Sequence, residues 1–143
     1  MNNDLIFSLA NGLAALGWLL LVVFPFKPFT NRVLVGVVVS LLCATYAVLV
    51  YQSLQPSDFT KFSTLQGVAS LMSTPGAVLV GWIHYLAFDL VAGMWAFGDA
   101  KGRNIPHYLL AICLGFTFIF GPFGFTLYWL LRRFYPKTMN ENV

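Results

Sequence analysis

The stretch Trp82-Ile-His-Tyr-Leu-Ala-Phe-Asp89 decides the fold class, because it places a histidine and an aspartate inside a membrane-length apolar run. That run extends from Ala77 to Phe97, and about 20 residues suffice for a helix to cross the hydrocarbon core of a bilayer. Asp89 lies near the middle of the run, where a carboxylate costs about 2.5–3.5 kcal/mol on insertion scales. Nothing in a general membrane fold requires that cost, so Asp89 is the first candidate functional residue.

The composition is that of an integral membrane protein with a single domain, residues 1–143. Of the 143 residues, 59% are hydrophobic and only 9% are charged, whereas a soluble domain carries about 25% charged residues. The net charge of +3 is too small and too dispersed to indicate nucleic acid, and it suggests contact with anionic lipid head groups instead. Cys43 and Cys113 each lie in an apolar span, so we expect buried thiols rather than a disulfide or a metal site.

The N-terminus lacks the features of a targeting segment. Met1-Asn-Asn-Asp4 carries an acid where a signal peptide carries Lys or Arg, and no stretch rich in Arg and Ser precedes the first apolar run. We therefore expect the first span to be retained, and the protein to reside in a bacterial inner (cytoplasmic) membrane, with an organelle protein that has already lost its transit peptide as the alternative.

Hydropathy predicts an all-α integral membrane bundle of four transmembrane helices, at about residues 5–24, 33–51, 77–97 and 105–131. Pro25-Phe-Lys-Pro28 should end the first span, and Ser57/Asp58 should cap a helix after the second. Apolar residues at helical spacing within 59–72 predict a short amphipathic helix in the membrane interface. Phe120-Gly-Pro-Phe-Gly124 should kink the fourth span and let another helix approach closely.

Four spans place both chain termini on the same side of the membrane. The basic residues then divide evenly between the two sides, so the positive-inside rule does not decide the orientation. Arg132-Arg133 directly follow a span, which weakly favours a cytoplasmic C-terminus. Four short spans enclose little volume, so a homodimer could complete a pocket for a long ligand.

Polar residues gather on the third span. Trp82, Tyr85, Asp89 and Gly93 fall on nearly one helical face, and Tyr85 lies one turn before Asp89, where it could hydrogen-bond the carboxylate. His84 is about 140° round the helix from Asp89 and about 7.5 Å along it, so these two side chains cannot share one small ligand. The chemistry that remains is general acid–base catalysis by a carboxylate, an imidazole and a phenol in an apolar pocket.

Metal binding is an alternative that the spacing does not favour. The candidate ligands show no established ligand spacing, so no cofactor is expected and a metal ion stays open. Asp99 and His107 flank a short loop that could bring them together at the membrane surface. The metal candidates are His84, Asp89, Asp99 and His107.

The pattern Trp82-x-His84-Tyr85-Leu86-x-Phe88-Asp89-Leu90-x-x-Gly93-x-Trp95-x-x-x-Asp99, then His107, then Gly121-Pro122-x-Gly124, resembles the abscisic-acid-deficient-4-like family of small four-span membrane proteins. The likeness covers most of the chain after Phe59. In plants this family is tied to the formation of neoxanthin from violaxanthin, a redox-neutral isomerisation in which an epoxide opens and the polyene becomes an allene. The resemblance therefore implies a carotenoid or another isoprenoid as the ligand.

That reaction needs an acid to protonate the epoxide oxygen and a base to remove a proton from the polyene. The resemblance implies that Asp89 is one of these groups and that His84 or Tyr85 is its counterpart. The residues expected to contact the substrate are Trp82, Phe88, Gly93, Trp95, Gly121 and Pro122.

Other functions stay open. The chain could be a non-catalytic carotenoid-binding or assembly protein, in which Asp89 and His84 tie helices together, or a metal-dependent carotenoid-modifying enzyme. A small transporter is less favoured, because the sequence shows neither an inverted repeat nor paired broken helices.

Overall fold

The computed structural model describes residues 2–24 and 28–137, and within these ranges all regular structure is helical. Three helical stretches are long and apolar enough to cross a membrane. They are α1 (Asn3–Val23), the continuous stretch Phe29–Ser53, and α5 (Pro75–Lys101). The middle stretch consists of α2 (Pro28–Val33), a π-helical segment at Leu34–Val39, and α3 (Ser40–Ser53). The predicted all-helical fold is therefore confirmed, with three candidate membrane spans rather than four.

The three long helices pack closely at Gly17 of α1. A Cβ atom at Gly17 would lie 2.9 Å from a methyl group of Leu90 on α5 and 3.0 Å from a methyl group of Val38. On the other side of the same contact, the Trp18 ring covers Gly93 of α5, where an added Cβ would lie 2.5 Å from the indole. Small residues allow helix backbones to approach closely in membranes, where dispersion contacts drive helix association. These glycines therefore set the spacing of the bundle.

The ends of the first two spans differ slightly from the prediction. Helix α1 ends at Val23, and the predicted proline stop falls partly on residues 25–27, outside the described residues. The Asn2 side chain caps α1 by accepting from the backbone N–H groups of Asp4 and Leu5, at 3.1 and 3.3 Å. The second span begins earlier than predicted, since Pro28 suits the first position of a helix.

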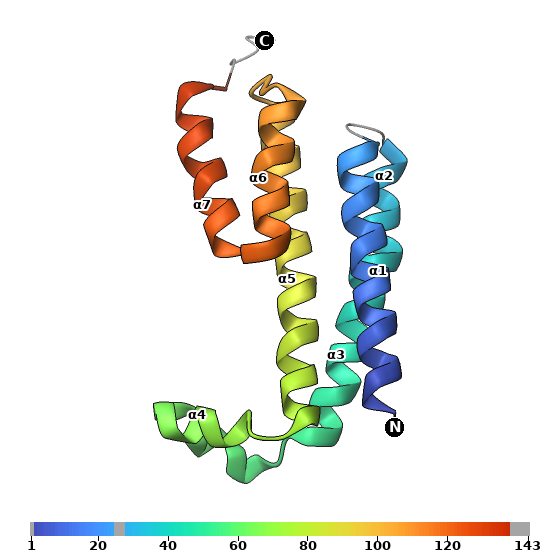
Figure 1. The fold of residues 1–143 in the computed structure, drawn as a ribbon, viewed down its shortest axis with the longest axis vertical. Coiled ribbons are helices and arrows are strands. Elements are labelled where there is room, and N and C mark those ends of the chain that lie inside the picture. The colour runs from blue at the N-terminus through green and yellow to red at the C-terminus, as the bar shows by residue number, and fades with distance from the viewer. Residues whose placement is uncertain (1, 25–27, 138–143) are drawn as a thin grey trace, which may run out of the picture.

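The prediction of one continuous interfacial helix at 59–72 is wrong. The segment forms a 3-10 helix, Pro56–Ser63, followed by α4 (Leu65–Leu71). Thr64 between them is extended, and its hydroxyl caps α4 by accepting from Gly67 N–H at 3.0 Å. The predicted Ser57/Asp58 cap is also corrected, because Gln55 is the cap residue and Asp58 accepts its N–H at 2.9 Å. Figure 1 shows the segment lying across one end of the bundle.

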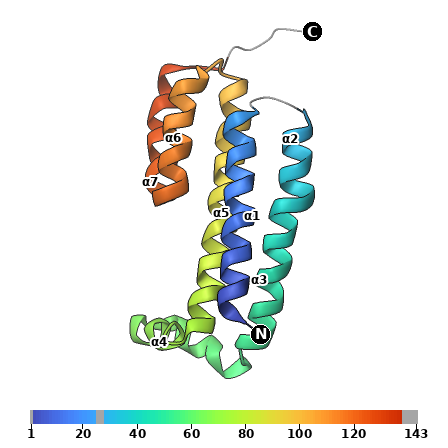
Figure 2. The same ribbon diagram turned by 45° about the vertical axis from the view of Figure 1, so that its right-hand side comes forward.

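The predicted fourth span, 105–131, is wrong. It is a helical hairpin made of α6 (His107–Phe120) and α7 (Pro122–Leu131), followed by a short 3-10 turn at Arg132–Phe134. The two helices lie antiparallel, side by side, against the half of α5 nearer its C-terminal end (Figures 1 and 2). Helices of 14 and 10 residues extend about 21 and 15 Å, less than the hydrocarbon core of about 30 Å.

Three residues explain the reversal. Gly121 adopts a φ of +44°, a conformation that glycine enters without steric cost. Pro122 has no N–H group, so the α6 helix cannot continue through it. Gly124 lets the two backbones touch, because a Cβ atom there would overlap the backbone nitrogen of Thr117. The predicted close approach is confirmed, but the predicted kink is a complete turn.

The hairpin also changes the expected topology. It returns the chain to the end of the molecule where α5 finishes, so the last described turn lies at the opposite end from the start of α1 (Figure 1). The prediction that both termini lie on one side is therefore not met by this fold.

Candidate functional site

The hairpin tip lies directly on Asp89. A Cβ atom at Gly121 would be 2.6 Å from Asp89 Oδ1 and 2.8 Å from Oδ2, so only glycine leaves room for the carboxyl group. Oδ2 of Asp89 is buried and accepts no hydrogen bond from any described residue. Gly121 precedes the first turn of α7, and a helix N-terminus carries partial positive charge from its unbonded N–H groups. The carboxyl group of Asp89 therefore faces the favourable end of α7.

Tyr85 contacts the other half of the broken helix. Its hydroxyl donates to the carbonyl oxygen of Ile119, in the last turn of α6, at 3.0 Å. The final carbonyls of a helix lack intrahelical partners, so this bond satisfies one of them. The phenol also neighbours the Asp89 carboxyl group. One turn of α5 thus contacts both ends of the reversal, with Tyr85 at the end of α6 and Asp89 at the start of α7.

Trp82 continues this face of α5 toward its N-terminal end. Its ring lies 5.5 Å from that of Tyr85 and 5.8 Å from that of Phe7 on α1. Its indole N–H donates to Asn11 Oδ1 at 3.0 Å, a contact that the sequence analysis missed. The signal was present, since Asn11 is an isolated amide in the first apolar run.

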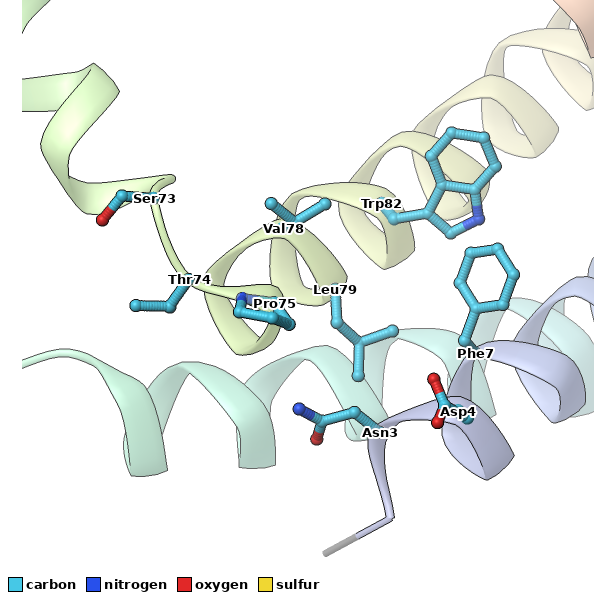
Figure 3. Close-up of a pocket in the computed structure, with 9 residues that line it drawn as sticks. All are labelled: Asn3, Asp4, Phe7, Ser73, Thr74, Pro75, Val78, Leu79 and Trp82. Atoms are coloured by element: carbon cyan, nitrogen blue, oxygen red, sulfur yellow. The ribbon is translucent and has the colours of Figure 1, made fainter.

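Trp82 also borders an open hollow of about 360 Å³ between the first turns of α1 and α5. Figure 3 shows its ring facing Phe7, with the Asp4 carboxylate beside Phe7. Polar and apolar side chains both line this hollow, so it could accept one end of an amphipathic ligand. The lining residues are Asn3, Asp4, Phe7, Ser73, Thr74, Pro75, Val78, Leu79 and Trp82.

His84 lies on a different face of α5 from Asp89. Its ring stacks on Phe88 at 4.6 Å and lies 5.4 Å from Tyr46 of α3. Both His84 and Phe88 are exposed at the surface that a membrane would cover. The structure therefore separates His84 and Phe88 from the group formed by Tyr85, Asp89 and Gly121, as the angle between positions 84 and 89 predicts.

Most of the other predicted site residues make contacts away from Asp89. Gly93 is covered by Trp18 and serves the α1–α5 contact. Trp95 lies near the C-terminal end of α5, where its ring stacks with that of Trp129 at 6.2 Å. Pro122 is exposed at the tip, whereas Gly121 is buried. Of the predicted substrate contacts, the structure brings Trp82 and Gly121 to the face that carries Tyr85 and Asp89.

Asp99 and His107 do not meet. The Asp99 carboxylate accepts from the Tyr128 hydroxyl at 2.7 Å and from Arg103 Nε at 2.8 Å. His107 Nε2 lies 2.9 Å from the carbonyl oxygen of Val22 on α1. Tyr128 is not among the predicted site residues, yet its buried phenol connects α7 to α5. Its local signal was weak, because the same helix also carries the hydroxyl of Thr126.

The metal candidates lie in separate places. Within residues 2–24 and 28–137, no three His, Cys, Asp or Glu side chains form a group that could hold a metal ion. His84 stacks among aromatic rings, Asp89 faces the hairpin tip, and Asp99 and His107 have the contacts given above.

Comparison with known proteins gives one match. The family model described as "ABA4-like: ABA DEFICIENT 4-like" matches residues 5–128, which include nearly all of the three long helices and of the hairpin. No curated protein and no solved structure matches the chain. Because the match covers most of the sequence, the chain belongs to the ABA DEFICIENT 4-like family.

Proposed function

We propose that the protein is a membrane-embedded isomerase that acts on a carotenoid or a related isoprenoid, with Asp89 exchanging a proton with the substrate. The observation that carries the proposal is the Asp89 carboxyl group, whose buried Oδ2 atom lies in a candidate membrane span and accepts no hydrogen bond from the residues that the structure describes. A buried polar atom without a partner costs free energy, so its presence in an apolar span suggests a function. Membership of the family supports a role related to neoxanthin.

Tyr85 is the proposed counterpart of Asp89, because it is the second proton-bearing side chain at the hairpin tip. Opening an epoxide to an allene requires one proton to reach the epoxide oxygen and one to leave a carbon of the polyene, so no atoms are gained or lost. Two neighbouring groups that donate and accept protons suffice for this exchange. His84 is directed toward Tyr46 and Phe88, and is not part of the proposed pair.

The aromatic side chains next to the pair support an apolar, elongated substrate. Trp82 is 39% exposed and adjoins both Tyr85 and the hollow near Asp4. A polyene lying along this face would pass from the hairpin tip to the polar lining of that hollow. We also propose the cytoplasmic membrane of a bacterium as the location.

Expression in a carotenoid-producing bacterium tests the proposal. We expect a new pigment of unchanged mass and altered absorbance with the native chain, and none with Asp89→Asn. Tyr85→Phe should reduce its yield. His84→Gln is the matched control, because it alters a proton-bearing residue of the same helix outside the pair, and it should retain the product. Equal yields of extracted protein exclude loss of folding, and a product that persists in Asp89→Asn removes Asp89 from the reaction.

A non-catalytic pigment-binding or assembly role is the second candidate. It is favoured by the contacts that Tyr85 and Asp89 make with both ends of the reversal, since those contacts also hold the hairpin in place. Pigment that co-purifies unchanged with the protein would support this role. A product heavier by oxygen would instead support a metal-dependent enzyme.

A further inference from the structure

A second polar cluster lies at the C-terminal end of α5, away from the proposed reaction site. Three cationic side chains converge on the Asp99 carboxylate: Arg103 at 2.8 Å, Arg132 at 3.3 Å and Lys137 at 3.5 Å. We call these four residues, together with Tyr128, the Asp99 cluster. They come from α5, the loop after it, α7 and the segment that follows α7, so the cluster fastens the hairpin to α5.

The cluster has more positive than negative charge. Its single carboxylate faces three cations, and the other described acidic residues, Asp4, Asp58 and Asp89, lie elsewhere along the molecule. The side chains of Arg103 and Arg132 are only 12% and 16% exposed. Removing such charges from water is costly unless counter-charges and hydrogen bonds compensate for it. Arg103 also donates to the carbonyl oxygen of Tyr135 at 2.9 Å, but the remaining surplus of positive charge favours an additional anion.

The surroundings of the cluster match a membrane surface. The Arg132 guanidinium lies over the ring of Trp129 at 4.4 Å and over that of Trp95 at 5.2 Å. Tryptophan is enriched where the hydrocarbon core meets the head groups. The Lys137 side chain is 60% exposed, and its ammonium group is the most accessible of the three cations. The anion available at that depth is the phosphate group of a lipid.

We propose that the Asp99 cluster binds the phosphate group of an anionic membrane lipid, with Lys137 and Arg132 as the contacting side chains. Arg132 presents guanidinium N–H donors that suit phosphate oxygens. Lys137 supplies a mobile point charge at the rim. Bound phosphate neutralises the surplus charge and thereby stabilises the packing of the hairpin against α5 at the membrane surface. This inference does not depend on the proposed isomerase activity.

Native mass spectrometry of the purified full-length chain in a neutral detergent tests the site. The delipidated protein is titrated with phosphatidylglycerol or with phosphatidylcholine, which carries the same phosphate but no net charge. We expect one tightly bound phosphatidylglycerol per chain and clearly weaker binding of phosphatidylcholine. Lys137→Gln should weaken phosphatidylglycerol binding about fivefold, which corresponds to about 1 kcal/mol for one cation near an anionic surface.

Lys101→Gln is the matched control, because it removes the same charge from an exposed position at the same end of the molecule, outside the cluster. It should leave phosphatidylglycerol binding unchanged. Equal binding of the two lipids, or equal weakening by Lys101→Gln and Lys137→Gln, overturns the proposal. Inorganic phosphate added as a competitor distinguishes the sources: displacement of the lipid shows a site for phosphate in any form, and persistence of the lipid shows a site for the lipid itself.

Discussion

Gly121 and Asp89 show how one pair of residues serves both the fold and the proposed chemistry. The glycine permits the backbone conformation of the reversal and leaves room for the carboxyl group. A side chain at position 121 would be strained twice, by the positive φ and by the contact with Asp89. The carboxyl group of the proposed reaction and the hairpin tip therefore depend on the same contact.

Gly121→Ala is expected to lower the free energy of unfolding by about 1–3 kcal/mol, the usual cost of a strained backbone position, and to reduce any pigment conversion. Unfolding of the detergent-solubilised protein in denaturant measures the change. Gly12→Ala is the control, since nothing lies within 4 Å of a Cβ there, and alanine should stabilise the helix interior by about 0.5–1 kcal/mol. A Gly121→Ala protein as stable as the native chain would contradict the role given to this glycine.

Among the helical elements, the hairpin depends on polar contacts at both ends. At the tip, Tyr85 and Asp89 contact the reversal. At the other end, Tyr128 of α7 donates to Asp99 of α5. Lipid cannot hydrogen-bond the exposed backbone groups of a broken helix, so protein contacts must do so.

Tyr128→Phe is expected to loosen α7, because it removes a buried hydrogen bond to a charged group, a contact of about 1.5–3 kcal/mol. Hydrogen exchange of the α7 amides should accelerate, while exchange in α1 stays unchanged. Tyr108→Phe is the control, since Tyr108 is 68% exposed. Removal of its hydroxyl should change the amide exchange of neither α7 nor α1. Identical α7 exchange in the Tyr128→Phe and native proteins would show that the hydroxyl does not hold the hairpin.

The 3-10 helix Pro56–Ser63 has a pH-dependent cap. The Lys61 ammonium at 2.8 Å and the N–H of Gln55 hold the pKa of the Asp58 carboxyl below its ordinary value of 3.8. A lowered folded-state pKa means that the stabilisation is present above pH 3.8 and is lost as the pH falls through the folded-state value.

We therefore expect hydrogen exchange in the 3-10 helix, corrected for the intrinsic effect of pH, to accelerate below pH 3.8. In Asp58→Asn the corrected exchange should be faster at neutral pH and no longer change with acidification. Asp4→Asn, which removes a carboxylate from α1, should preserve the native response of this segment. A pH response that persists in Asp58→Asn would assign it to another group.

At the scale of the whole molecule, the hairpin places the basic residues that follow α7 at the same end as those of α2 and of the segment between α5 and α6. Lys61 belongs to the 3-10 helix Pro56–Ser63, next to α4, and α4 lies at the other end (Figure 1). The positive-inside rule, undecided for four spans, now favours a cytoplasmic location for the loop between α5 and α6 and for the end of the hairpin. The described basic residues at that end are Arg32, Lys101, Arg103, Arg132, Arg133 and Lys137.

Labelling with a membrane-impermeant maleimide tests this topology in a variant whose native cysteines are replaced. Ser57→Cys should react in intact cells, and Lys137→Cys should react only after permeabilisation, because the two positions lie on opposite sides. Four complete spans would place both on one side and give them the same reactivity. Inverted reactivity would retain the hairpin but reverse the orientation.

A homodimer, which we also propose, is tested separately by the mass of the detergent-solubilised protein.

The sequence by itself determined the membrane class, the helical content, three long spans and the likeness to the family, because each follows from local composition and spacing. It also placed Tyr85 near Asp89 and His84 away from it, since all three lie on one helix. Only the tertiary structure decided that residues 107–131 turn back and that Gly121 lies on Asp89. The physical reason is that hydropathy is the same for an apolar helix that crosses the bilayer and for one that reverses within it. The difference depends on contacts between residues about 30 positions apart, such as Asp89 with Gly121 and Asp99 with Tyr128, and helical periodicity contains no record of them.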